Sequence, residues 1–138
     1  MNERHFSLRA ALPHSYPFLL IDKVLEIEQG KRVACVKNVS YNDEVFHGRS
    51  ADDPVFPEVY IIEAMAQTSG LLLDGKGSRG AYLSMIRDMR FHTQVKSGDR
   101  LVIVSSLFHG LPPLFVFEVK ALVGDDVAAQ GEITLALI

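Results

Sequence analysis

The sequence holds a single cysteine, Cys35, among its 138 residues. One cysteine excludes an intrachain disulfide and a cysteine-rich metal site, and it suits a reducing compartment. Long apolar runs are also missing, because the longest one near the N-terminus covers residues 18–21 and ends at Asp22. Such a run is too short for a secretory signal or a membrane span. We therefore expect a cytoplasmic protein that does not contact a membrane, with Cys35 as a small core residue.

A strong excess of either charge is absent as well. The 14 basic and 17 acidic side chains leave a formal net charge of −3, which gives no general attraction to phosphate backbones. No phosphate-binding loop is present, so we expect no nucleic-acid partner and no cofactor. Asp52, Asp53 and Glu58 share one acidic loop. No histidine or cysteine stands near them at ligand spacing, so we also expect no metal.

One apolar segment differs from the rest of the chain. Hydrophobic residues make up 48% of the sequence, which suffices for one core, so residues 1–138 are expected to form a single domain. Residues 59–73, VYIIEAMAQTSGLLL, carry apolar side chains on every face of a helix. Pro57 suits a first helical position, and the glycines of residues 74–77 suit its end. A helix of this kind must be surrounded by the rest of the protein.

The remaining pattern has the shorter period and the β-branched content of strands. Six strands are expected at residues 24–28, 32–39, 81–91, 101–108, 114–123 and 127–138. Short turns separate the last four strands, which predicts an antiparallel meander. The element order fits an α+β domain in which a curved antiparallel sheet wraps one helix, the hotdog architecture. Because such a sheet leaves an edge and part of the helix uncovered, we expect a second protomer to complete the burial.

Glu63 is the only acidic side chain of residues 59–73, and Gln67 lies one turn later on the same helix face. A carboxyl group in an apolar environment favours its protonated form unless donors compensate, and this is the property of a general acid near neutral pH. The alternative is a structural glutamate whose oxygens are satisfied by the backbone or by Gln67. We favour a catalytic role for Glu63.

A loop is expected before this helix, at residues 47–58 with the sequence HGRSADDPVFPE. Where the loop meets the helix, around Glu58 and Val59, the backbone N–H groups and the positive end of the helix dipole are free. These groups suit a carbonyl oxygen that gains negative charge during a reaction. His47 is a candidate proton carrier in the same loop, and the alternative is a solvated histidine without a catalytic role.

Three segments resemble a known enzyme family: LPHSYPFLLID at residues 12–22, KNVS at residues 37–40, and PVFP at residues 54–57 followed by IIEAMAQ at residues 61–67. They resemble the (3R)-hydroxyacyl-acyl carrier protein dehydratases of bacterial fatty-acid synthesis, over nearly the whole chain. The resemblance implies the hotdog fold, homodimers or trimers of dimers, and removal of water from a 3-hydroxyacyl thioester on acyl carrier protein or coenzyme A. It also implies a site with a histidine from one protomer and a glutamate from its partner, and it gives the glutamate role to Glu63.

The histidine of that family falls on Arg49, because the family's QGHFP corresponds to HGRSA at residues 47–51. A guanidinium group stays protonated and cannot accept a proton, although it can donate hydrogen bonds to a thioester carbonyl. Glu58 likewise stands where the family has a glycine at the helix start. Its side chain adds bulk and charge beside the expected thioester site.

Three functions follow from this pattern. The first is a dehydratase in which His47 replaces the missing base while Glu63 handles the departing hydroxyl group. The second is a non-catalytic acyl-binding chain, or a subunit that supplies Glu63 to a histidine-bearing paralogue in a heterodimer. The third is an acyl thioesterase in which Glu63 activates water or attacks the substrate directly. The resemblance favours the dehydratase.

Further residues near the helix are expected to bind the substrate or to support the fold. The expected substrate contacts are Arg49, Glu58, Val59 and Gln67. His14 lies in a loop beside a proline, and we expect it to make a structural hydrogen bond rather than to act in catalysis.

Overall fold

The computed structural model describes residues 12–14, 18–47, 54–73 and 80–138. Strands account for most of the described residues. In chain order the elements are β1 (Lys23–Glu28), β2 (Arg32–Asn38), the 3-10 helix η1 (Glu44–Phe46), α2 (Glu58–Gly70), the 3-10 helix η2 (Leu71–Leu73), β3 (Ala81–Phe91), β4 (Arg100–Leu111), β5 (Leu114–Val123) and β6 (Asp126–Leu137).

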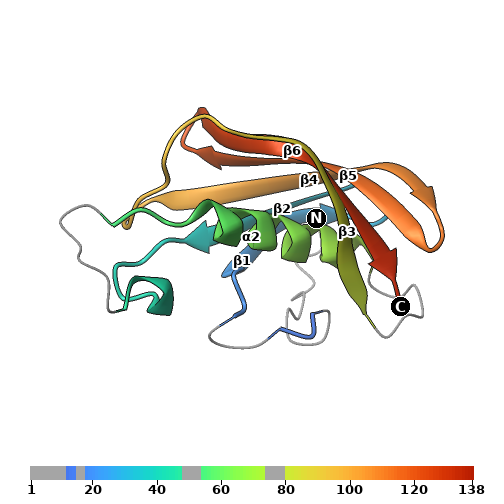
Figure 1. Ribbon diagram of the computed structural model, residues 1–138, viewed down its shortest axis with the longest axis horizontal. Coiled ribbons are helices and arrows are strands. Elements are labelled where there is room, and N and C mark those ends of the chain that lie inside the picture. The colour runs from blue at the N-terminus through green and yellow to red at the C-terminus, as the bar shows by residue number, and fades with distance from the viewer. Residues whose placement is uncertain (1–11, 15–17, 48–53, 74–79) are drawn as a thin grey trace.

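The strands form one antiparallel sheet in the order β1-β2-β4-β5-β6-β3. Figure 1 shows this sheet curving around α2, which lies along its concave side. The expected α+β hotdog fold is therefore confirmed. The expected strand limits differ from the observed ones by at most three residues, because alternating burial along a sheet leaves a period of two in the sequence.

The expected meander of the last four strands is wrong for β3. Of these four strands, only β4, β5 and β6 are neighbours in chain order within the sheet, and β3 pairs with β6 at the sheet edge. The connection at residues 92–99 crosses from β6 towards β2: His92 N–H donates to Ala128 O (2.7 Å), and Gly98 N–H donates to Val39 O (2.6 Å). The turn at Gly98, whose φ is +92°, thus ends a crossover and does not close a hairpin.

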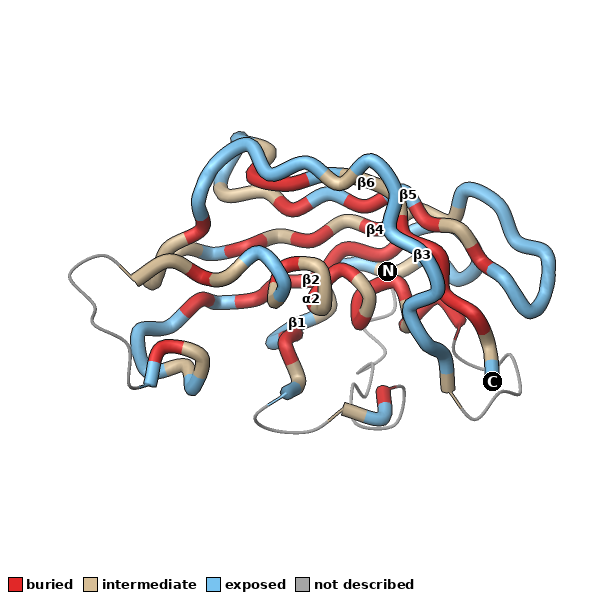
Figure 2. The backbone as a smooth tube through the Cα atoms, viewed as in Figure 1, coloured by how far each residue is buried: buried red, intermediate tan, exposed pale blue. Residues whose placement is uncertain are grey.

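The core lies between α2 and the concave face of the sheet. Along β5 and the first half of β4, buried residues alternate with more exposed ones, as the banded tubes in Figure 2 show. The fully buried members include Leu101, Ile103, Phe117 and Ala121 from these strands. Cys35 on β2 is also fully buried, which confirms the expected core position. From the helix, Ile61 and Met65 fill the same layer.

The helix begins and ends close to the expected positions. Pro57 precedes the first helical residue with φ −61° and ψ 141°, so its fixed φ suits the helix start although it stands one position earlier than expected. After Gly70 the chain continues as η2, and Leu71, Leu72 and Leu73 are all buried. Among the described residues, no helix combines the length and the apolar character that crossing a bilayer requires.

The single chain covers only one side of α2. Positions 59, 62, 63, 66 and 70 keep partial or full exposure, and Val59 is 68% exposed. Their spacing of three and four residues places them on one helix face. We call this face, formed by Val59, Ile62, Glu63, Ala66 and Gly70, the open stripe. The neighbouring edge strand β3 is exposed along almost its whole length, including Tyr82, Met85 and Ile86.

Candidate active site

Glu63 lies in the second turn of α2, on the open stripe, with 26% of its side chain exposed. One of its carboxylate oxygens, Oε1, accepts a hydrogen bond from Gln67 Nε2 at 3.0 Å. The same oxygen lies 3.3 Å from His14 Nε2. Two nitrogen atoms therefore converge on a single oxygen of a carboxyl group that the helix presents at its uncovered face.

Gln67 is 1% exposed and makes three hydrogen bonds within the chain. Its Oε1 accepts from Leu20 N–H (2.9 Å), and its Nε2 donates to Phe18 O (2.8 Å) as well as to Glu63. The side chain thus joins the N-terminal segment to α2 and orients the Glu63 carboxyl group. The expected contact between Gln67 and a substrate remains a prediction of the sequence.

His14 is brought to the site from the N-terminal segment. Its Nε2 faces Glu63, and its ring centroid lies 6.0 Å from that of Phe18. Its Nδ1 is buried and has no hydrogen-bond partner in the part of the chain that the structure describes. The structural hydrogen bond expected for His14 stays a prediction, and the 3.3 Å approach of its Nε2 to Glu63 Oε1 was not predicted from the sequence. No periodicity connects positions 14 and 63, and the LPHSYPF motif was the only signal that could have linked them.

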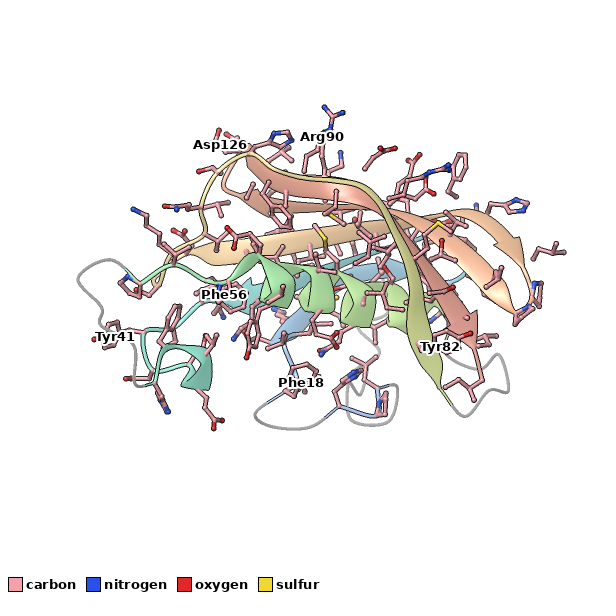
Figure 3. All side chains as sticks on the ribbon, in the orientation of Figure 1. Phe18, Tyr41, Phe56, Tyr82, Arg90 and Asp126 are labelled. Atoms are coloured by element: carbon pink, nitrogen blue, oxygen red, sulfur yellow. The ribbon has the colours of Figure 1, made fainter. Side chains whose placement is uncertain are left out.

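Aromatic rings extend from this pair along the start of α2. The rings of Phe18 and Tyr60 meet edge to face at 6.5 Å, and those of Tyr60 and Phe56 lie 5.7 Å apart. Figure 3 shows Phe18 beneath the helix and Phe56 at its beginning. These three residues line a cavity of about 470 Å³. The site therefore lies beside a cavity with one aromatic wall, of a size that accommodates a small organic group.

A buried lysine forms the polar wall of this cavity. Lys37 Nζ lies 3.2 Å from Asp43 Oδ2 and 3.8 Å from Asp22 Oδ2, while only 8% of its side chain is exposed. Asp22 also accepts a hydrogen bond from Asn38 N–H at 2.7 Å. Because two carboxylates surround the ammonium group, the buried charge is compensated. The cluster of Lys37, Asp22 and Asp43 connects β2 to the segment before η1 and lines the cavity.

The loop that precedes α2 is described only at its two ends. His47 is exposed, and its Nε2 lies 3.3 Å from Asn42 O in the same segment. Arg49, with Asp52 and Asp53, lies outside the described residues. The expected meeting of His47 with Glu63 of a partner protomer stays a prediction.

Glu58 and Val59, the first two residues of α2, are both exposed. No side chain among the described residues caps the helix. The first helical N–H donors with a backbone acceptor are those of Tyr60 and Ile61, both to Pro57 O. The backbone N–H groups of Glu58 and Val59 therefore have no acceptor among the described residues. This geometry agrees with the oxygen-binding role expected for the helix start.

A family model described as a FabA-like domain matches residues 12–132, which includes all the residues that converge on Glu63. The chain belongs to the FabA-like family. A FabA-like relative from Ruminiclostridium cellulolyticum, the 3-hydroxyacyl-[acyl-carrier-protein] dehydratase FabZ, is 43% identical over 134 residues and 94% of each chain. FabZ from Anaplasma marginale (strain Florida) is 40% identical over 136 residues, 94% of this chain and 92% of its own.

Solved structures share the fold of this FabA-like chain at lower identity. The dehydratase heterocomplex ApeI:P from Xenorhabdus doucetiae superimposes with a TM-score of 0.84 and 22% identity, covering 98% of this chain and 93% of the other. An uncharacterized protein, PH1136 from Pyrococcus horikoshii, gives a TM-score of 0.70 and 18% identity over 86% and 84% of the two chains. Both likenesses concern the fold.

Proposed function

We propose that this FabA-like chain is a 3-hydroxyacyl-[acyl carrier protein] dehydratase of fatty-acid biosynthesis, a hydro-lyase. The observation that carries the proposal is the oriented carboxyl group of Glu63, the only acidic side chain on the open stripe of α2. It is supported by relatives of that name at 40–43% identity over nearly the whole chain. No observation in the described residues favours thioester hydrolysis instead.

The reaction removes one proton and one hydroxyl group from the acyl chain. A base takes the proton from C2 of the 3-hydroxyacyl thioester, the C2–H electron pair forms the double bond, and the C3–O bond breaks. Glu63 gives its proton to the departing hydroxyl group, so that water and a trans-2-enoyl thioester are formed. The backbone N–H groups of Glu58 and Val59 stabilise the negative charge on the thioester oxygen.

We assign the base that removes the proton from C2 of the substrate to the loop before α2. Arg49 cannot accept a proton, so its role is to bind the thioester or the carrier. His47, two positions earlier and exposed, supplies the base from the partner protomer. The second candidate is a heterodimer in which a histidine-bearing paralogue is the partner and this chain supplies Glu63. It is favoured by the presence of Arg49 at the position where the resemblance implies a histidine.

A second copy of the chain is proposed to cover the open stripe and β3. Large apolar side chains are exposed both on the helix, at Val59, and on the edge strand β3, at Tyr82, Met85 and Ile86. The outer edge of β3 has no strand partner among the described residues. Exposed apolar patches and unpaired edges of this kind are typical of subunit interfaces. Two chains related by a twofold axis would pair β3 with β3 and bring each Glu63 to the partner's loop.

Replacement of Glu63 tests the proposal directly. In hydration of a short trans-2-enoyl thioester, followed by the loss of its absorbance, Glu63→Gln should lower kcat by at least about 100-fold while the protein stays folded. Glu118→Gln, on an exposed position of β5, is the matched control and should retain activity. Unchanged turnover in Glu63→Gln would assign Glu63 a structural role only.

A further inference from the structure

The hydrogen bonds of Gln67 determine which of its amide atoms faces Glu63. Leu20 N–H is a donor and requires the amide oxygen, while Phe18 O is an acceptor and requires the amide nitrogen. The amide therefore cannot be turned around without losing both bonds. Since Nε2 is the atom directed at Glu63, Gln67 donates and Glu63 Oε1 accepts.

The surroundings of His14 determine in the same way which of its two ring nitrogens can donate a hydrogen bond. Its Nδ1 is buried and has no hydrogen-bond partner among the described residues, so a proton there would be an unpaired buried donor. Its Nε2 faces a carboxylate oxygen, which accepts but does not donate when ionised. The neutral tautomer with the proton on Nε2 satisfies both conditions. In this tautomer the Nε2–H group is 3.3 Å from Glu63 Oε1, close enough to act as a second donor beside Gln67.

These contacts leave the two Glu63 oxygens in different positions. Oε1 accepts a hydrogen bond from Gln67 Nε2 and lies 3.3 Å from His14 Nε2, whereas Oε2 has no partner among the described residues. A proton on the carboxyl group therefore belongs on Oε2, because a proton on Oε1 would meet two N–H groups. His14 cannot itself reach a substrate with a free nitrogen, since one ring nitrogen is buried and the other is engaged.

We propose that His14 is a positioning residue of the active site: its Nε2–H and that of Gln67 together occupy Glu63 Oε1 and leave Oε2 as the oxygen that exchanges a proton with the substrate. The inference rests on the proposed dehydratase function for its catalytic consequence, but the contact itself concerns only the chain. It assigns to the N-terminal segment, through residue 14, a direct influence on the reactive carboxyl group.

Two substitutions of His14 separate its possible roles in catalysis. His14→Ala removes the donor and should lower kcat by about 10- to 100-fold, the range expected for one hydrogen bond to a charged group, with KM changed less than about twofold. His14→Gln keeps an N–H donor near the Nε2 position and should restore most of the lost activity. The matched control is His109→Ala, at an exposed position on β4. A His14→Gln variant no better than His14→Ala, with both folded, would overturn the proposal.

A second measurement does not depend on activity. In protein labelled with carbon-13 at the glutamate carboxyl groups, the Glu63 signal is identified by its absence in Glu63→Gln. His14→Ala should move this signal, His14→Gln should return it towards the wild-type position, and His109→Ala should leave it unchanged. A Glu63 signal that does not respond to His14→Ala overturns the proposal even if the wild-type chain is inactive. If the wild-type chain is inactive but its Glu63 signal responds to His14→Ala, the result contradicts the dehydratase function and leaves the contact between His14 and Glu63 supported.

Discussion

Cys35 illustrates how burial of one group makes stability depend on pH. Burial raises the pKa of its thiol from an ordinary value of 9.0 to about 12, and the nearby Thr68 hydroxyl offsets only part of this effect. Between these values the thiol of the unfolded chain loses its proton while the thiol of the folded chain keeps it. Rising pH therefore favours the unfolded state across this interval.

The expected result is a pH-dependent difference between the wild type and Cys35→Ala. Above pH 9, the free energy of unfolding of the wild type should fall relative to that of the variant, by up to about 1.4 kcal/mol per pH unit. Urea unfolding of both proteins between pH 8 and pH 10.5 measures this difference, and other titrating groups cancel in the comparison. A constant difference over that interval would show that the folded thiol titrates normally.

The neighbours of Glu63 show which contacts a sequence can reveal. Gln67 lies four residues from Glu63 on one helix, and the expected approach of the two side chains follows from helix geometry alone. His14 is 49 residues away in the chain, and only the tertiary packing of the N-terminal segment brings it to the carboxyl group. Helix periodicity could therefore predict the first contact but not the second.

At the level of elements, local pattern predicted what each segment forms but not where β3 lies. Residues 81–91 were expected to be a strand and are one, yet they pair with β6 rather than with β4. The position of β3 in the sheet depends on which sheet edge is free after α2 has crossed the concave face. A local sequence pattern does not predict which edge this is. The connection at residues 92–99 can span about 26 Å, more than the roughly 14 Å across the intervening strands.

The proposed function makes the reaction rate depend on the loop before α2 and on the start of that helix. Because Arg49 replaces the expected base, dehydratase activity of the purified chain should lie about 10² to 10⁴-fold below that of a family member with histidine. The remaining activity should depend on His47. Enoyl thioester hydration by wild type, His47→Ala and Arg49→His measures both effects, with Ser50→Phe and Ala51→Pro added to the last variant to restore the family's loop.

Two results would contradict this assignment. If His47→Ala keeps the wild-type activity, His47 is not the substitute base. If Arg49→His in the restored loop gains nothing, the restriction lies elsewhere, and the Glu58 side chain at the helix start becomes the first candidate. A Glu58→Gly exchange in the same background would then be expected to raise the rate.

For the whole molecule, the open stripe and β3 predict an obligate dimer. Light scattering at micromolar concentration should give twice the mass of the chain. Ile86→Asp, which places a charge on the exposed edge strand β3, should shift the mass towards the monomer because a charge buried at an interface without a partner is costly. Leu25→Asp, on the opposite sheet edge β1, is the matched control. A stable folded wild-type monomer would contradict the prediction.

The position of Glu63 on the open stripe also has a consequence for evolution. Val59, Ile62, Ala66 and Gly70 share that helix face with the carboxyl group proposed to act in catalysis, so a substitution at any of them is expected to affect assembly and chemistry together. On this proposal such positions are under two selective constraints, whereas exposed residues of the convex sheet face, such as Glu118 and Lys120, are under neither. After a gene duplication, one of the two chains can lose its catalytic histidine and still be retained, provided that its α2 helix still packs against the other chain.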